Sequence, residues 1–122
     1  MRRLPDSELE VMMAIWSYDH PVTRVEIEQQ MNREQKVSAT TILSFLSRLE
    51  EKGFVSVKKA GKTNIYKARI SKKKYLGEES KSILNRMYGS SLKNFVTAFY
   101  DGKPVSNEEI EELQDFLDSF KE

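Results

Sequence analysis

One segment of the chain combines short hydroxyl side chains with helical spacing. Between Ser38 and Glu51, an apolar stripe predicts a helix, and about 100° per residue places a polar face opposite that stripe. This face consists of Thr40, Ser44, Ser47 and Glu51, flanked by Thr41, Leu43 and Arg48. Hydroxyl groups bond phosphates or base edges, threonine methyl groups contact the thymine methyl group, and a helix N-terminus attracts phosphate. These residue types favour contact with nucleic acid over simple solvation of an exposed helix.

Lysine and arginine dominate the region from Lys36 to Lys74, which holds 11 of them against two acidic residues. A run of charge usually marks a solvated face, but here it coincides with a predicted hairpin beside the hydroxyl-bearing helix. We expect the hairpin lysines to form a wing that neutralises phosphates, which gives affinity and salt dependence without sequence information. The predicted DNA-contacting residues are Ser38, Thr40, Thr41, Leu43, Ser44, Arg48, Lys58, Lys59, Lys62 and Lys67.

Catalytic chemistry has little support in this sequence. The single histidine, His20, lies in a predicted turn without a nucleophile motif near it, and a solvated turn histidine is expected. The acidic residues between Glu108 and Glu112 begin a predicted helix, where they favour the positive end of its dipole over a metal cluster. Gly61-Lys62-Thr63 echoes a phosphate loop but lacks its first glycine and joins two predicted strands. The prediction is a protein that is not an enzyme and has no metal site and no cofactor.

Charge divides the 122 residues into two regions, although the net charge is only +1. Residues 1–75 carry 15 Lys and Arg against 9 Asp and Glu, whereas residues 76–122 carry 5 against 10. This polarity suggests a nucleic-acid-facing end and an end that faces something else. The absence of cysteine excludes disulfides and thiolate metal sites. No apolar run approaches the ~18 residues that cross a bilayer, and no signal peptide is evident, so we expect a cytoplasmic protein without membrane association.

Two short helices are predicted first. The first begins near Asp6 or Ser7 and is stopped by Pro21. Its apolar stripe is predicted to be Leu9, Met12, Met13 and Trp16. A capping box of Thr23 and Glu26 then starts a second helix at Arg24, which is expected to end near Asn32.

The third helix and a hairpin complete the N-terminal part. Ser38 is the expected N-cap of the third helix, and Gly53 is expected to close it in the left-handed conformation. The apolar period then changes to two, which predicts a hairpin over residues 55–70. This order of three helices and a hairpin is typical of a winged helix-turn-helix domain, although other small α+β domains share it.

The C-terminal part is predicted to be helical over residues 71–88, 91–100 and 107–120, with a capping box at Ser106 and Glu109. The expected fold class is therefore α+β and mostly helical, with a DNA-binding domain over residues 1–73 and a dimerisation region over residues 74–122.

Three short helices cannot enclose the many large apolar residues of the dimerisation region, so a second copy is expected to cover them. Contact with the chain's own N-terminal domain is the alternative. The predicted dimer contacts are Leu92, Phe95, Phe99, Leu113, Phe116 and Leu117.

Several short motifs, taken in their order along the chain, resemble the penicillinase-repressor family, the BlaI, MecI and CopY type of bacterial transcriptional repressor. In the N-terminal half the motifs are Glu8–Met12, Ile15-Trp16, Val37–Ile42 with Leu46, Arg48 and Leu49, Glu51–Phe54, Gly61-Lys62 and Tyr66. In the C-terminal half they are Met87–Gly89 and Glu109–Leu113. The resemblance covers essentially the whole chain. It implies a winged-helix repressor that dimerises through C-terminal helices and binds a palindromic operator of antibiotic-resistance or stress genes.

The chain departs from the family pattern at three points. Leu43 stands where the family often has Lys or Arg, which implies a different base preference. The clustered cysteines of the copper-responsive members are missing, which excludes copper sensing by that route. A sensor-activated protease cuts an Asn-Phe bond in the penicillinase and methicillin repressors, and the aligned pair here is Ala98-Phe99. A sensor-linked protease is therefore a partner that the resemblance suggests and the asparagine position does not support.

A second function class stays open beside DNA binding. A winged helix can also serve as a protein-interaction module, with its basic face against an acidic partner and without sequence-specific DNA binding. Such a protein would show no preference for a palindromic duplex over random DNA.

Overall fold

The computed structural model describes residues 3–31, 37–102 and 104–121. The chain divides into two compact units, one ending at Ser80 and the other beginning at Lys81. Helix α4 (Lys72–Tyr88) runs through this boundary and contributes to both units. The fold is mostly helical with one small sheet, as the sequence predicts.

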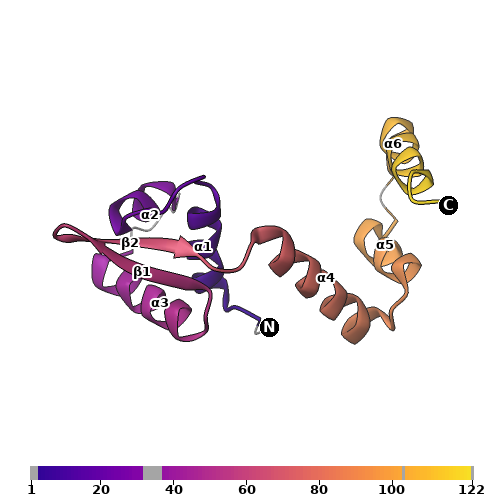
Figure 1. The fold of residues 1–122 in the computed structure, drawn as a ribbon. Coiled ribbons are helices and arrows are strands. Elements are labelled where there is room, and N and C mark those ends of the chain that lie inside the picture. Colours follow the sequence, from indigo (N-terminus) through magenta and orange to yellow (C-terminus); the bar gives the residue numbers. More distant parts are fainter. Residues whose placement is uncertain (1–2, 32–36, 103, 122) are drawn as a thin grey trace. The chain divides into compact units, whose positions relative to one another are not determined.

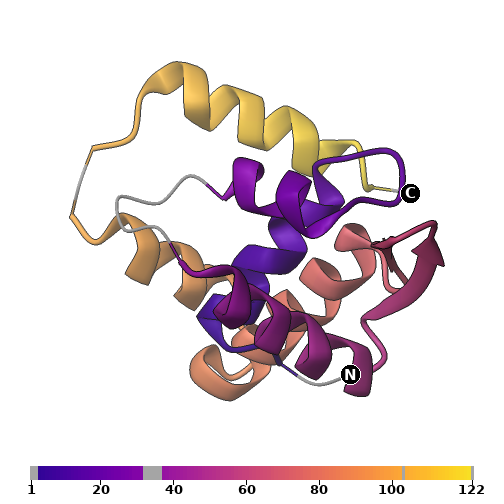
Figure 2. The ribbon, with the colours of Figure 1, turned by 90° about the vertical axis from the view of Figure 1, so that its left-hand side faces the viewer.

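The first unit contains three helices and a hairpin before α4. The elements are α1 (Asp6–Trp16), α2 (Arg24–Gln30), α3 (Ala39–Glu51), β1 (Val55–Ala60) and β2 (Thr63–Ala68). Helix α1 contacts α2, α3 and β2, and Figures 1 and 2 show the three helices clustered with the hairpin along one side. The strands pair antiparallel, and Val22 adds one bridge to Tyr66 from the turn after α1. This is the winged helix-turn-helix arrangement expected from the order of elements.

Local sequence signals set the start of α2 and both ends of α3 as predicted. The capping box of α2 is complete: Thr23 N–H donates to Glu26 Oε1 at 3.0 Å, and Glu26 N–H donates to Thr23 Oγ1 at 3.2 Å. Ser38 caps α3 by accepting from Thr41 N–H at 3.2 Å. Gly53 follows α3 with a φ of 81°, the left-handed conformation that a side chain disfavours. Helix α2 ends at Gln30, two residues before the predicted end near Asn32, which itself lies outside the described residues.

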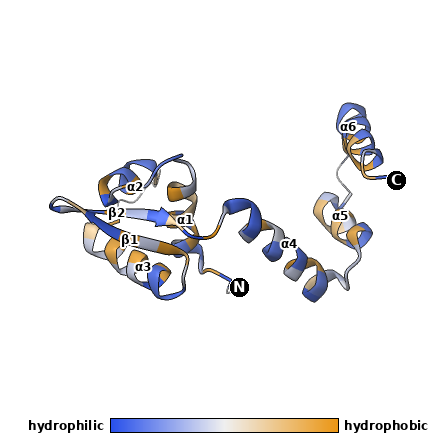
Figure 3. Ribbon diagram, in the orientation of Figure 1, coloured by the Kyte–Doolittle hydropathy of each residue, from blue (hydrophilic) through white to orange (hydrophobic). Residues whose placement is uncertain are grey.

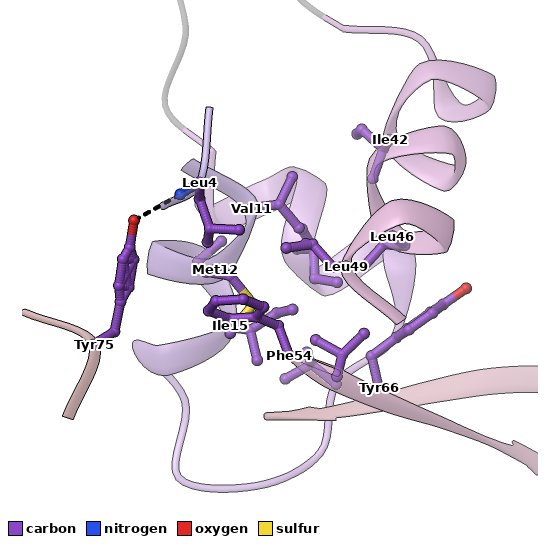
Figure 4. Packing of buried hydrophobic residues seen from close by; sticks show 14 residues of the cluster. Leu4, Val11, Met12, Ile15, Ile42, Leu46, Leu49, Phe54, Tyr66 and Tyr75 are labelled. Atoms are coloured by element: carbon purple, nitrogen blue, oxygen red, sulfur yellow. Dashed lines mark hydrogen bonds between the residues drawn. The ribbon is translucent and has the colours of Figure 1, made fainter. Parts of the chain in front are cut away.

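The core of the first unit joins α1, α3 and the hairpin. Figure 4 shows its side chains converging from these elements: Val11, Met12, Ile15, Ile42, Leu46, Leu49, Phe54 and Tyr66. All are buried. The apolar stripe that predicted α3 is therefore the face that positions this helix, and its polar face is turned to solvent.

The predicted stripe of α1 was partly wrong. Met12 is buried and Leu9 and Trp16 pack against the core, but Met13 is exposed. Helix α1 instead buries a broad arc that includes Val11, Ala14 and Ile15. A single stripe describes a helix with one packing partner, whereas α1 packs against two helices and a strand at once.

The start of α4 is attached to the first unit by two hydrogen bonds. The backbone N–H of Leu4 donates to the buried hydroxyl of Tyr75 at 2.9 Å (Figure 4). The indole N–H of Trp16 donates to the carbonyl oxygen of Ile70 at 2.9 Å, and its ring meets that of Tyr75 edge to face at 5.9 Å. These contacts fix where α4 leaves the hairpin.

A nearly buried ion pair links α1 to the end of α3. Glu8 Oε1 lies 2.5 Å from Lys52 Nζ, and the exposed fractions of the two side chains are 4% and 17%. Lys52 belongs to the basic region recognised in the sequence, but its charge is neutralised inside the domain. Lys36, another member of that region, lies outside the described residues.

Breaking this ion pair from either side should have unequal costs. Lys52→Met leaves the more deeply buried Glu8 carboxylate unpaired and should reduce the free energy of unfolding by about 2 kcal/mol, below the full burial penalty because Lys52 itself reaches solvent. Glu8→Met should cost less, since Lys52 can extend into water. The double variant should recover part of the Lys52→Met loss in urea denaturation. Losses that simply add would contradict a coupled pair.

The second unit contains the rest of α4 with α5 (Leu92–Tyr100) and α6 (Asn107–Asp118). Ser91 and Ser106 cap α5 and α6 as side-chain acceptors. At α6 the predicted capping box forms in one direction, because Glu109 Oε1 instead accepts from the hydroxyl of Tyr100 at 2.9 Å. This hydrogen bond raises the pKa of Tyr100 above its ordinary value.

No residue of α5 or α6 is buried. Figure 3 shows that apolar residues nevertheless continue along both helices. Among the residues that the structure describes, no helix has the length and apolarity needed to span a membrane.

Candidate nucleic-acid interface

The polar face of α3 is exposed along its length. The sequence places seven residues on this side of the helix, and all of them are exposed in the structure: Thr40, Thr41, Leu43, Ser44, Ser47, Arg48 and Glu51. The opposite side is held in the core by Ile42, Leu46 and Leu49. Burial of that apolar side therefore determines which residues α3 presents outward.

The first turn of α3 favours an anionic partner. The Ser38 hydroxyl caps Thr41 N–H and lies 2.9 Å from the Thr41 hydroxyl. A helix N-terminus carries partial positive charge and unpaired backbone donors. At the other end, Glu50 and Glu51 are exposed and acidic. The attraction for phosphate is therefore concentrated in the N-terminal half of α3.

The strand register places the four wing lysines on different parts of the hairpin. These lysines are Lys58, Lys59, Lys62 and Lys67. Lys59 pairs with Asn64, and it shares a face with Val57 and Tyr66, the side of the hairpin that packs toward α3. Lys58 and Lys67 alternate to the opposite face. Lys62 lies in the turn between the strands, next to Gly61, whose φ is 67°. The sequence identified a basic hairpin but not this division.

Residues of the hairpin turn and of α3 line one shallow surface hollow of about 310 Å³. Its lining residues are Thr23, Arg24, Val25, Leu43, Lys62, Thr63, Asn64 and Tyr66. Leu43 and Lys62, predicted from separate patterns, thus line one hollow. Val25 and Asn64 were not predicted as site residues. The two-residue period of the hairpin could have placed Asn64 on this side, whereas Val25 lies on α2, for which the sequence predicted no contact with the hairpin.

Lys67 lies apart from this hollow. It lines another depression, together with Tyr18, Asp19, His20 and Pro21. The Asp19 carboxylate is thus a neighbouring negative charge at this position. Lys62, by contrast, lines a hollow together with Leu43 of α3.

His20 occupies an exposed turn, as expected. Its Nδ1 lies 2.9 Å from the carbonyl oxygen of Pro21, and its ring is tilted against that of Tyr18 at 5.3 Å. Within the described ranges, no group of three or more metal-binding side chains comes together. Neither observation points to catalysis.

The predicted dimer contacts lie on α5 and α6. Five of them are exposed and Phe95 is half-buried: Leu92, Phe99, Leu113, Phe116 and Leu117 are the exposed ones. Ala98 and Phe99, the pair aligned with the family's cleavage position, are exposed residues within α5. A protease would therefore meet this bond inside a helix.

Comparison with known proteins places these features in a family. The sequence profile described as penicillinase repressor matches residues 4–119. The chain is 34% identical to the penicillinase repressor of Bacillus licheniformis over 99% of this chain and 96% of that protein. It is 31% identical to the methicillin resistance regulatory protein MecI of Mammaliicoccus sciuri over 93% of this chain and 92% of that protein.

Two solved structures resemble the N-terminal part. The DNA-binding domain of the repressor BlaI matches with a TM-score of 0.51 and 29% identity, over 62% of this chain and 94% of that one. The monomeric form of Bacillus licheniformis BlaI, solved in complex with the blaP half-operator, matches with a TM-score of 0.50 and 30% identity. That match covers 61% of this chain and 89% of the other.

Proposed function

The chain belongs to the penicillinase repressor family, and we propose that it is a homodimeric transcriptional repressor that binds a palindromic DNA operator. The observation that carries the proposal is the exposed hydroxyl-bearing face of α3, whose Leu43 lines one hollow with Lys62 of the hairpin. The similar BlaI chain, solved with a half-operator, supports DNA as the partner. The proposal assigns no enzymatic activity, and it places the protein in the cytoplasm with its operator.

In this proposal α3 enters the major groove. Recognition helices of helix-turn-helix proteins contact base edges with their N-terminal residues, which here include Thr40, Thr41 and Ser44. Leu43 faces the groove, and Arg48 and the hairpin lysines contact phosphates. Residues 1–73 then act as the DNA-binding domain and residues 74–122 as the dimerisation region.

Dimerisation is expected to strengthen operator binding. The apolar residues of α5 and α6 are exposed in the single chain, and a second copy can cover them. Two linked domains that bind half-sites about one helical turn apart gain an effective concentration worth roughly 10² or more in affinity. Separating the subunits, by proteolysis at Ala98-Phe99 or by another signal, therefore releases the promoter. The regulated genes are proposed to serve antibiotic resistance or stress responses.

Salt dependence tests the phosphate contacts. Binding to a palindromic duplex selected from a random pool should weaken steeply with salt, because each phosphate contact releases counterions. Lys62→Gln changes two positions in a dimer and should reduce the slope of log K against log salt by about 2. Fluorescence anisotropy over a salt series measures this slope. Lys121→Gln, at an exposed lysine beyond α6, is the matched control and should leave the slope unchanged.

Two results would contradict the proposal. Affinity that stays flat between low and moderate salt would exclude phosphate contacts. Equal binding of palindromic and random duplexes in competition would instead favour the protein-interaction module.

A further inference from the structure

Two exposed apolar side chains interrupt the polar surface where α2, α3 and the hairpin meet. Leu43 of α3 is 42% exposed and Val25 of α2 is 49% exposed, and both line the same hollow. Neighbouring positions on the face of α3 carry hydroxyl groups, so Leu43 is the apolar exception on the predicted reading surface. Neither residue belongs to the hydrophobic core cluster of the first unit, so a partner can reach both side chains.

The surroundings of this apolar pair favour DNA over an apolar protein surface. Lys62, Thr63 and Asn64 border the hollow from the hairpin. A second, adjoining depression contains Leu43 with Ser47 and Asn64, and Glu50 lines its side toward the C-terminal end of α3. The hollow thus offers an apolar contact bordered by a cation and hydrogen-bonding groups, which complements a base edge beside a phosphate.

Thymine is the base that fits this combination. In the major groove it presents a C5-methyl group, whereas cytosine presents an N4 donor and the purines present polar N7 edges. Leucine and valine side chains cannot hydrogen-bond and so gain nothing from those polar edges. We propose that Leu43, with Val25 beside it, receives a thymine methyl group and so specifies thymine at one position of each half-site.

This inference rests on the proposed function, because it requires α3 to enter the major groove. It adds a specificity that the hydroxyl groups of α3 do not supply. Serine and threonine hydroxyls accept or donate to several bases, whereas an apolar contact rewards the methyl group alone.

Deoxyuridine substitution tests the inference, because uracil differs from thymine only by lacking this methyl group. The 122-residue protein first selects duplexes from a random pool, and each thymine of the selected palindrome is then replaced by deoxyuridine in both half-sites. One symmetric pair of replacements should weaken binding by about 15-fold, because each lost methyl contact reduces the affinity about fourfold and a dimer loses two of them. Replacements beyond the reach of Leu43 and of the threonine methyl groups of α3 should change affinity little.

A protein variant identifies the side chain that senses the methyl group. Leu43→Ala should bind the thymine and deoxyuridine duplexes with nearly equal affinity, because the contact is already lost. Val25→Ala should reduce the ratio only in part. Met13→Ala, which truncates a similarly exposed apolar residue (41%) in a different hollow on α1, should retain the full ratio. Thermal melts followed by circular dichroism check that each variant is folded.

The outcomes separate this inference from the proposed function. If the protein selects a palindrome but no thymine-to-deoxyuridine change weakens binding, the methyl contact is wrong and the repressor proposal stands. If every sensitive thymine keeps its full effect in Leu43→Ala, the assignment to Leu43 is also overturned. If no duplex is selected at all, the proposed function itself fails.

Discussion

Phe99→Glu combined with Phe116→Glu should convert the protein to a monomer and weaken binding to a palindromic operator by about 100-fold. The two side chains are 70% and 58% exposed in the single chain, and their ring contacts within it are to aromatic residues one to four positions away. A dimer that covers them would have to bury two carboxylates per subunit, which is costly when they are unpaired. Sedimentation equilibrium measures the mass, and fluorescence anisotropy measures the operator affinity.

A half-site duplex separates this effect from misfolding. The double variant and the unchanged protein should bind one half-site equally well, because one DNA-binding unit suffices for it. Asn94→Glu with Thr97→Glu adds the same two charges at exposed positions opposite the apolar stripe of α5, and it should leave the dimer intact. Undiminished operator binding by a monomeric Phe99→Glu, Phe116→Glu variant would refute the role of dimerisation.

Phe54→Ala should destabilise the first unit by about 3–5 kcal/mol, the usual range for removing a buried phenylalanine. Phe54 is 1% exposed, and its ring meets that of Tyr75 at 5.7 Å. Its backbone also joins two elements, since Phe54 N–H donates to Leu49 and its carbonyl oxygen accepts from Arg69. Total stabilities of small domains are about 5–15 kcal/mol, so a large share of the first unit's stability depends on this residue.

Urea denaturation of the unchanged protein and the variant measures this loss. Met13→Ala removes a comparable apolar volume at an exposed position and should change stability by less than about 1 kcal/mol. A Phe54→Ala variant as stable as the Met13→Ala control would mean that the core around Phe54 tolerates the cavity.

Local signals predicted the ends of elements well. The capping box at Thr23, the N-cap at Ser38 and the left-handed Gly53 all act within a few residues, so a short window of sequence contains their cause. The sequence predicted the third helix equally well, because α3 has a single buried side and its apolar stripe therefore shows a clear period. Its exposed face could be read from the same pattern.

Packing and contacts that depend on residues far apart in the sequence were predicted less well. The stripe of α1 was misassigned because this helix has three packing partners. Lys52 was counted as part of a basic surface because its partner, Glu8, lies far away in the sequence. The hollow at Leu43 also escaped prediction, since it requires the register of the hairpin against α2 and α3. The contacts of individual site residues with DNA stay predictions.

The attachment of α4 gives the chain a built-in optical reporter. Its single tryptophan, Trp16, is the residue whose indole bonds to Ile70 and whose ring meets Tyr75. Tryptophan emission therefore comes from one place, the joint between the winged helix and the helix that leaves it. Loosening of that joint shifts the wavelength of this emission. Structural changes confined to α5 and α6 occur in helices that contain no tryptophan.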